Sequence, residues 1–333
     1  MQKLLTIVVP VYKVEPYINK CLDSCILTDE KLMSQLEVII VNDGTPDRSA
    51  EMSREYVKRY PQTFRQIDKE NGGHGSAWNV GLKEATGKYL RFLDSDDWLT
   101  NLDKLMEKLA ETDVDLVFTQ MTKYHASTDE YELENIQDTY GVCKDLINLD
   151  FSINSYMHLL DFWHTTYKSD ILRYKTDLFM EHTMYDDGIL FVLPAVKGKT
   201  YIAYDFVLYN YYIGRDGQSL SQEKSPKSVR ARYKQLQYMW SFWEQHKNEV
   251  NAKLNMEMKI IIVRFANFLF GDFHVLPFKD SKTYSQQCAN YMDSITLTSY
   301  GKVYKRYKKY PFPIFYIMEK IRNSNLYRVI IKR

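Results

Sequence analysis

Three carboxylates follow an apolar run in the first third of the chain. The run covers residues 89–93, and the carboxylates are Asp94, Asp96 and Asp97. Holding them together at the end of a buried strand is costly, because each lies in the field of the others and loses hydration. A divalent cation removes that cost, and Mg2+ typically takes one or two protein carboxylates and completes its shell with water and substrate phosphates. The alternative is an acidic turn in which Asp97 caps the next helix.

The preceding segments alternate between β-branched apolar runs and stretches with apolar residues at helical spacing. We expect strands at 6–12, 36–44 (with its polar turn) and 64–69, and helices at 15–27, 45–60 and 75–85. Thr45 is the expected N-cap of the second helix. This alternation predicts an α/β fold with a mostly parallel central sheet flanked by helices. Ligands bind at the carboxyl ends of strands in such sheets, where Asp43 and Asp94 should face the same site.

Four motifs, in order and at matching spacing, resemble those of the family 2 nucleotide-sugar glycosyltransferases. They are Val9-Pro10-Val11-Tyr12 with Glu15, Val41-Asn42-Asp43-Gly44-Thr45 with Asp47, Asn71-Gly72-Gly73 with Asn79-Val80-Gly81-Leu82, and Phe92-Leu93-Asp94-Ser95-Asp96-Asp97. The resemblance covers roughly residues 4–215 and implies a GT-A fold. It implies one glycosyltransferase domain over 1–220, with a Rossmann-like nucleotide-sugar-binding half at 1–98 and an acceptor half at 99–220.

The resemblance also implies a set of donor-binding residues. Those around the nucleobase and ribose are Pro10, Val11, Tyr12, Glu15 and Asp43. An aspartate that accepts from an imide N–H suits uracil, because adenine offers no equivalent donor, so a UDP-linked sugar is implied. Taken alone, Asp43 could instead form an Asx turn before Gly44. The other implied donor contacts are Asn71, Gly72, Gly73, His74, Asn79, Asp94, Ser95 and Arg215.

The glycine loop departs from the family pattern at one position. The family usually runs from Gly-Gly through one apolar residue to Ser, whereas this chain has Gly72-Gly73-His74-Gly75-Ser76. The two glycines permit the positive φ angles of a tight loop over a ligand, although an ordinary turn uses them too. His74 either contacts a phosphate or the donor sugar, or is a solvated loop residue. Asp94 is expected at the ribose and Asp96 at a Mn2+ or Mg2+ ion, while Asp97 is either a second metal ligand or a cap.

The second half of the chain resembles the family in a segment that ends in an acidic pair, Asp186 and Asp187. The resemblance makes Asp187 the general base, which takes the proton of the acceptor hydroxyl while the metal stabilises the departing diphosphate. With an ordinary pKa this carboxylate is ionised at neutral pH. Both aspartates belong to the predicted catalytic set. Without the motif, they could simply cap a helix beginning at Gly188.

Three further residues complete the predicted site. Arg215 lies in a segment that resembles a family motif with stretched spacing, where it would stabilise the diphosphate or pair with Asp216 on the surface. Trp163 and His164 are expected to wall the acceptor pocket, because aromatic faces suit the C–H surfaces of sugars. Core packing is the alternative for Trp163.

Composition agrees with a globular enzyme of two units. The chain has 333 residues, 45% of them hydrophobic, which is enough for a full core. A helical C-terminal extension is expected at 221–333. The four cysteines have no metal-ligand spacing, no signal peptide is visible, and the most apolar late stretch, 260–270, is too short to span a bilayer. We therefore expect a cytoplasmic protein.

The net charge of +1 conceals an asymmetry. Residues 300–333 hold ten Lys and Arg against one acid, Glu319, which gives +9 there and −8 in the rest of the chain. Aromatic residues interleave with these cations. This combination favours peripheral contact with an anionic membrane at the inner face, at about 1 kcal/mol per basic residue near the surface. The alternatives are a solvated tail or a contact within a homo-oligomer, and a nucleotide-sugar site argues against nucleic acid.

These observations together predict metal-dependent, inverting transfer of a sugar from a nucleotide diphosphate sugar to a hydroxyl of a glycan or lipid-linked glycan in surface polysaccharide synthesis. A nucleotidyltransferase that makes a nucleotide sugar is the enzymatic alternative, but only Lys13 stands near the first-strand loop to hold a triphosphate. A catalytically inactive sugar-binding scaffold is the other alternative, against which Asp96 and Asp187 argue. The sugar, the linkage and the oligomeric state are not specified by the sequence.

Overall fold

The computed structural model describes residues 3–134, 147–148, 161–175, 177–183, 185–215, 225–294 and 302–322. The chain divides into two compact units, Met1–Gln218 and Ser219–Arg333. Cys143, Asp216 and the parts 300–301 and 323–333 of the basic tail lie outside the described residues.

A single sheet forms the centre of the first unit, with strands in the order β3-β2-β1-β4-β9-β6-β10-β5. The first four are mutually parallel. β1 (Leu5–Val11) lies between β2 (Leu36–Asn42) and β4 (Tyr89–Phe92), and β3 (Phe64–Asp68) pairs with β2. Every residue of β1, β2 and β4 is buried, as expected for a parallel sheet covered on both faces. The predicted parallel arrangement therefore holds on this side of the sheet.

The other side of the sheet is mixed. β9 (Thr165–Lys168) lies antiparallel between β4 and β6 (Leu116–His125), while β10 (Thr200–Ile213) runs parallel to β6. Three short strands pair antiparallel with these: β5 (Trp98–Leu99) and β8 (Ile147–Asn148) with β10, and β7 (Glu130–Glu134) with β6. The α/β class with a helix-flanked central sheet is confirmed, and parallel pairing gives way to mixed pairing beyond β4.

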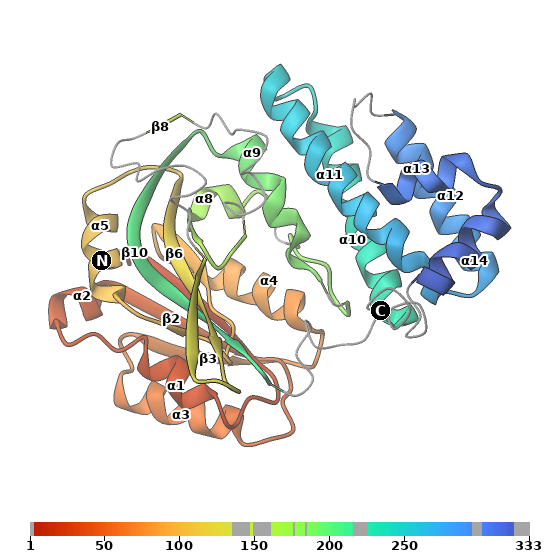
Figure 1. The fold of residues 1–333 in the computed structure, drawn as a ribbon. Helices are drawn as coiled ribbons and strands as arrows, with labels where there is room; N and C mark the ends of the chain where they lie inside the picture. Colours follow the sequence, from red (N-terminus) through yellow and green to blue (C-terminus); the bar gives the residue numbers. More distant parts are fainter. Residues whose placement is uncertain are drawn as a thin grey trace. The chain divides into compact units, whose positions relative to one another are not determined.

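Helices cover the sheet on both sides. α4 (His74–Glu84) packs on β1 and β2, while α3 (Ser49–Arg59) packs on β3 and on α1 (Ile18–Asp23). Figure 1 shows α4 on one side of the sheet and the pair α1 and α3 on the other. The shorter helices are α2 (Glu30–Gln35), α5 (Leu102–Ala110), α8 (Ser169–Leu172), the 3-10 helix η1 (Asp187–Phe191) and α9 (Leu193–Lys197).

Several predicted helix starts are wrong. Thr45 caps no helix, because its hydroxyl donates to the Asp47 carboxylate (2.7 Å), which accepts the Ser49 N–H (3.1 Å) where α3 begins. The helix expected over 15–27 shortens to α1, since the Glu15 N–H also donates to Asp47 (3.2 Å) and holds that residue in a turn. Asp97 is likewise no cap, because α5 begins only at Leu102.

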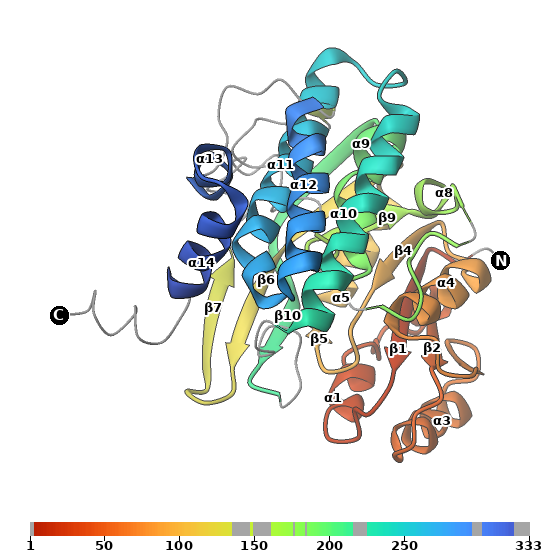
Figure 2. The same cartoon turned by 90° about the vertical axis from the view of Figure 1, so that its right-hand side faces the viewer.

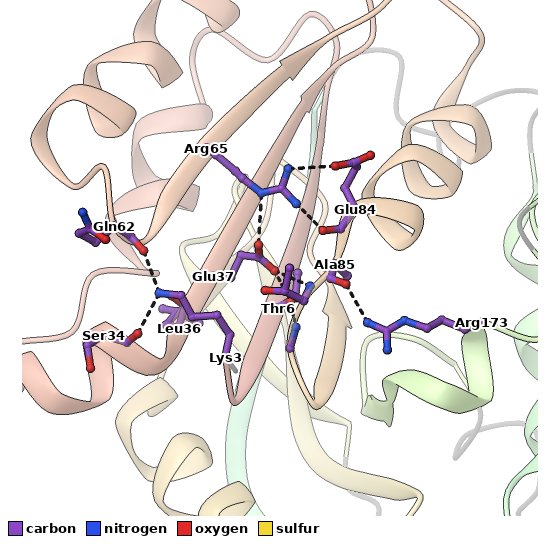
Figure 3. Close-up of polar contacts among 12 residues, drawn as sticks. Lys3, Thr6, Ser34, Leu36, Glu37, Gln62, Arg65, Glu84, Ala85 and Arg173 are labelled. Atoms are coloured by element: carbon purple, nitrogen blue, oxygen red, sulfur yellow. Dashed lines mark hydrogen bonds and ion pairs between the residues drawn. The ribbon is translucent and has the colours of Figure 1, made fainter. Parts of the chain in front are cut away.

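A polar network joins the amino ends of the parallel strands. The buried Glu37 carboxylate accepts hydrogen bonds from the Thr6 hydroxyl (2.5 Å), the Thr86 N–H (2.8 Å) and Arg65 Nε (3.2 Å). Arg65 also contacts Glu84 on α4, as Figure 3 shows. In the same view, Lys3 donates to the backbone carbonyls of Ser34, Leu36 and Gln62. The network thus ties β1, β2, β3 and α4 together at the end of the sheet away from Asp43 and Asp94.

The second unit is helical, as predicted. Its elements are α10 (Pro226–His246), α11 (Ala252–Asp272), the 3-10 helix η2 (Phe273–Val275), α12 (Phe278–Ser294), α13 (Lys302–Lys309) and α14 (Phe312–Arg322). Figure 2 shows α10, α11 and α12 alongside one another. Its core includes Phe270 and Phe273, together with Tyr304 and Phe315 from the basic tail. Among the described residues, no helix is long and apolar enough to cross a membrane.

Candidate functional site

The three carboxylates after β4 lie in different surroundings. Asp94 Oδ1 is 3.0 Å from His74 Nε2, and Asp96 Oδ2 is 3.3 Å from Arg215 Nη1. Burial raises the pKa of Asp96, the Asp94 carboxylate adds to the rise, and Arg215 opposes it. The Asp96 side chain nevertheless stays 14% exposed. The crowding that the sequence predicts is therefore present, and the Asp96 side chain keeps some exposed surface.

Asp97 has a structural role that the sequence did not reveal. Its carboxylate accepts from the Tyr209 hydroxyl (2.6 Å) and the Tyr212 N–H (2.8 Å), both on β10. The Tyr209 oxygen in turn accepts the Asp94 N–H (3.2 Å). Burial, followed by the charges of Asp96 and Asp94, raises the pKa of Asp97 well above its usual range. Asp97 thus fixes the turn after β4 to β10, and the engagement of both its oxygens argues against a second metal ligand.

Asp43, at the carboxyl end of β2, organises the glycine loop. Its Oδ1 accepts from Lys69 Nζ (2.7 Å) and the Gly72 N–H (2.9 Å), and its Oδ2 accepts from the Gly73 N–H (2.8 Å) and Asn71 Nδ2 (3.0 Å). Four donors match the lone-pair sites of a carboxylate. Direct contact with a uracil imide would require one of them to leave. The geometry therefore favours loop shaping by Asp43, and the uracil contact stays a prediction.

The first-strand motif combines buried residues with an exposed aromatic ring at the predicted nucleobase site. Pro10 and Val11 are buried in β1, whereas Tyr12, the residue after the strand, is 42% exposed. Glu15 accepts the Arg48 N–H (3.2 Å), which joins the loops after β1 and β2. Of this predicted nucleobase set, Tyr12 and Glu15 have exposed side chains, and Glu15 also lies 3.8 Å from the Arg48 guanidinium.

His74, the first residue of α4, bridges two carboxylates. Its Nδ1 lies 3.1 Å from Asp186 Oδ1, while Nε2 contacts Asp94. Burial by itself would lower the pKa of His74, but Asp186 and Asp94 outweigh that effect and raise this pKa well above its ordinary value. The two carboxylates thus stabilise the charged form of His74, and its contacts with both argue against the alternative of a merely solvated loop residue.

The two residues of the acidic pair differ in burial: Asp186 is more buried than Asp187. Asp186 is 4% exposed and contacts His74, whereas Asp187, which begins η1, keeps part of its surface exposed. Burial and the Asp186 carboxylate raise the pKa of Asp187 to about 6, so the expectation of an ordinary pKa is corrected. A general base works best with a pKa near the operating pH. This division supports Asp187 rather than Asp186 as the base.

The start of α4 is locked to the segment before the acidic pair. Asn79 Nδ2 donates to the Phe179 carbonyl (2.9 Å), and its Oδ1 accepts the Phe179 N–H (2.9 Å). A Cβ on Gly75 would lie 2.3 Å from the Met180 carbonyl oxygen and 2.4 Å from Asp186 Oδ2, so only glycine allows this approach. Two predicted donor contacts, Asn79 and Ser95, are buried, and the Asn79 amide is used in this clamp. A packing role therefore describes Asn79 better than donor binding.

The predicted acceptor residues lie beside β9. His164 is 1% exposed, and its Nδ1 is 2.7 Å from Asp161 Oδ1. The Trp163 ring packs at a tilt against the rings of Phe162 and Tyr211, with centroids 4.9 and 5.1 Å away. Packing accounts for His164 in this arrangement, because its ring is closed to an acceptor. The role of Trp163 at the acceptor stays a prediction.

A metal ion would need ligands from outside the protein at this site. Among the described residues, no group of three or more His, Cys, Asp or Glu side chains could hold one. A site completed by water and a diphosphate requires only one or two protein carboxylates. Asp96 fits such a site, because its side chain is partly exposed and a cation would relieve its crowding by Asp94. Arg215 supplies a fixed positive charge at the same place.

Sequence reasoning missed two residues that shape the site. Lys69 pairs with Asp43, and Tyr209 links Asp94 to Asp97. Lys69 directly precedes the glycine loop, so a search for a counter-charge to Asp43 could have found it. Tyr209 lies 112 positions beyond Asp97 and carries no local signal.

Comparisons with known proteins agree with this geometry. The family model described as glycosyl transferase family 2 matches residues 6–170. The chain is 42% identical over 119 residues to the uncharacterized glycosyltransferase EpsJ of Bacillus subtilis, covering 35% of this chain and 33% of that protein. It is 30% identical over 216 residues to the glycosyltransferase GlyA of Streptococcus pneumoniae, covering 62% and 29%. The minor teichoic acid biosynthesis protein GgaB of Bacillus subtilis is 29% identical over 222 residues, covering 65% and 24%.

Solved structures share the fold at low sequence identity. S. aureus TarS 1-349, in complex with UDP-GlcNAc, has a TM-score of 0.57 and 18% identity, covering 87% of this chain and 88% of that one. The mannosyltransferase PcManGT of Pyrobaculum calidifontis, in complex with GDP-Man and Mn2+, has a TM-score of 0.50 and 15% identity, covering 97% and 87%. At such identities the likeness concerns the fold alone, which is GT-A-like.

Residues 6–170 of this chain form a glycosyl transferase family 2 domain. The matched regions span about a quarter to a third of the length of the three curated relatives named above.

Proposed function

We propose that this protein transfers a sugar, with inversion, from a UDP-linked donor to a hydroxyl of a cell-surface glycan or lipid-linked glycan. The observation that carries the proposal is the meeting of donor-side and base-side carboxylates: His74 contacts both Asp94 and Asp186, and Asp186 adjoins Asp187. Family membership supports the reaction class. The name of GgaB, a teichoic acid biosynthesis protein, supports a cell-surface acceptor, and the UDP-GlcNAc bound to TarS supports a UDP donor.

The proposed mechanism assigns each side chain one task. Asp187 removes the proton of the acceptor hydroxyl as its oxygen attacks the anomeric carbon. Arg215 stabilises the diphosphate as charge develops on it. Asp96 would hold Mn2+ or Mg2+, which would supply Lewis-acid stabilisation to the same leaving group.

Metal-dependent donor hydrolysis tests this function. We would screen UDP-linked and GDP-linked sugars with Mn2+ or EDTA, and measure nucleoside diphosphate release and thermal shift. Slow, Mn2+-dependent release of UDP is the expected result. Release of pyrophosphate from a nucleoside triphosphate and sugar phosphate would instead support a nucleotidyltransferase, and no turnover with intact sugar binding would support a scaffold.

Asp96→Asn tests the metal assignment, because it preserves shape while removing the charge. The variant should stay folded and lose Mn2+-dependent UDP binding by calorimetry. Asp113→Asn, at an exposed carboxylate, is the matched control. Comparable UDP affinity in Asp96→Asn and its parent, with Mn2+ present, would contradict the assignment.

For the second unit, we propose peripheral contact with an anionic lipid surface through α13 and α14. Ile314 and Ile317 on α14 are 49% and 55% exposed, and they share a helix face because they are three residues apart. Exposed cations accompany them at Lys305, Lys308, Lys309, Lys320 and Arg322. Exposed apolar side chains amid basic charge are what an anionic interface attracts.

A point variant tests this contact better than removal of the tail. Tyr304, Phe315 and Tyr316 fill the core of the second unit, so truncation at residue 300 would damage the fold. The double variant Ile314→Ser/Ile317→Ser should abolish flotation with phosphatidylglycerol-containing vesicles, and salt should weaken flotation of the parent. Unchanged flotation would overturn the proposal. A change of sedimentation mass without loss of flotation would indicate a subunit contact instead.

A further inference from the structure

The imidazole of His74 has a carboxylate at each of its two nitrogens. Nδ1 is 3.1 Å from Asp186 Oδ1, and Nε2 is 3.0 Å from Asp94 Oδ1. An ionised carboxylate only accepts hydrogen bonds, so each ring nitrogen must carry a hydrogen and donate. With both carboxylates ionised, the ring is a cation and both of its donors are in use. Neither ring nitrogen is left to bind a phosphate or the sugar of the nucleotide-sugar substrate, which the sequence suggested as ligands of His74.

The ring is held in this orientation by packing as well as by charge. Its centroid lies 4.2 Å from that of Trp78, one turn further along α4, and Trp78 stacks in turn on Phe92 (4.2 Å). Trp78 is fully buried. Because the ring rests on a rigid aromatic support, its two nitrogens are aimed at fixed points.

The two carboxylates belong to opposite functional sides of the site. Asp94 follows β4 on the donor side, and Asp186 precedes the base Asp187. Other contacts also join these sides: the His182 N–H donates to the Gly72 carbonyl (2.6 Å), and Asn79 clamps Phe179. These other links are neutral. In the described part of the site, His74 is the cation that touches both sides.

We propose that His74 is a positioning residue that ties the base-bearing acidic pair to the donor-side aspartate and balances their negative charge. The inference rests on the proposed function for the roles of Asp94 and Asp187, but the bridge itself does not. Four carboxylates face His74: Asp94 and Asp186 in contact, and Asp187 and Asp96 at longer range. The positive charge of His74 opposes the rise in the Asp187 pKa, so its loss should make the base harder to ionise.

Nuclear magnetic resonance of the full-length protein tests the bridge without any ligand. The chain contains seven histidines, and His74→Gln identifies the signals of His74 by their disappearance from spectra of protein labelled with 15N in its histidine rings. We expect both ring nitrogens of His74 to be protonated at pH about 7.5. A neutral tautomer at that pH would overturn the proposal.

The pH profile of donor hydrolysis tests the positioning role. In His74→Gln, the acid limb of UDP release should move upward by about one pH unit, as expected when an opposite charge is removed, so release should fall by up to about tenfold below pH 6 and recover toward high pH. His125→Gln is the matched control, because His125 also pairs with a carboxylate, Glu132 (3.1 Å), but contacts neither Asp94 nor Asp186. An equal loss at every pH, or no loss, would contradict charge balancing by His74.

The two measurements separate this inference from the proposed function. Protonation at both nitrogens without turnover of any nucleotide sugar would leave the bridge in place and reject the enzymatic proposal. Normal turnover with an unshifted pH profile in His74→Gln would support the enzymatic proposal and reject the positioning role of His74. A lowered melting temperature alone, with the profile unchanged, would reduce His74 to a structural residue.

Discussion

The two ends of the central sheet both bury carboxylates, but they surround them differently. At the amino ends, Glu37 accepts from Thr6, Thr86 and Arg65, so hydrogen bonds and a guanidinium compensate its charge. At the carboxyl ends, Asp94, Asp96 and Asp97 lie in one another's field. Burial together with these neighbouring charges raises the pKa of both Asp96 and Asp97.

This difference separates a structural carboxylate from functional ones. A buried charge with matched donors holds elements together, and removing its partners leaves it uncompensated. Carboxylates that face like charges destabilise the empty site, and such a site gains most from a bound cation or from substrate. His74 and Arg215 supply part of that compensation at the carboxyl ends. The comparison predicts that substitutions at the two ends will affect different properties, activity at one and stability at the other.

The largest expected effect on activity is at Asp187. Asp187→Asn should lower glycosyl transfer by about 10² or more, the low end of what a positioned acid–base group contributes, while donor affinity stays nearly intact. Initial rates and calorimetric UDP binding would measure the two separately. If Asp186→Asn proves crippling and Asp187→Asn mild, the assignment within the acidic pair is reversed.

A methyl group at Gly75 should separate the two sides of the site. Gly75→Ala would place Cβ against the Met180 carbonyl and Asp186, and displacement of the acidic segment by about 1 Å can reduce turnover by up to about 10². The matched control is Gly271→Ala, since no atom lies within 4 Å of the added Cβ there. Equal activity of the two variants would show that the close approach at Gly75 does not position the base.

A substitution at the amino ends of the strands should change stability rather than activity. Glu37→Gln keeps the shape but weakens the bond to Arg65, and we expect a loss of about 1–3 kcal/mol in the free energy of unfolding. Urea denaturation would measure it. Specific activity of the folded protein should remain that of the parent. A variant with normal stability and reduced activity would remove the distinction between the two ends.

The smallest effect is the pH dependence of stability at Asp187. Its pKa is about 6 in the folded protein, against about 3.9 for an ordinary aspartate. The folded state therefore holds this proton more tightly, and the contribution to stability is lost as pH rises from about 4 through 6. Relative to the parent, the melting temperature of Asp187→Asn should rise across that interval and then level off. A constant difference from pH 4 to pH 8 would contradict the raised pKa.

Much of the donor side could be predicted from local sequence. The buried runs of β1, β2 and β4, and the polar residues that end them, are contiguous in the chain, so the positions of Asp43 and Asp94 at one edge followed from strand pattern alone. The helical character of the second unit was equally accessible. The antiparallel insertion of β9 between β4 and β6 was not, because a short strand carries no signal for its neighbours.

The roles of individual carboxylates depended on partners far away in the chain. From the sequence, Asp97 could be a cap or a metal ligand. The structure shows that its carboxylate accepts hydrogen bonds from Tyr209 and Tyr212 instead. Tyr304 and Phe315 were interpreted as membrane contacts, but they lie in a core that only folding brings together.

The residue types that stand where strands end can be predicted from local pattern, because that information is periodic along the chain. Which charges meet depends on how distant segments fold together. His74 and Asp186 are 112 positions apart, and no local pattern relates them. The raised pKa of His74 arises from that meeting, because the energy of a charge depends on its surroundings in space rather than on its neighbours in the chain.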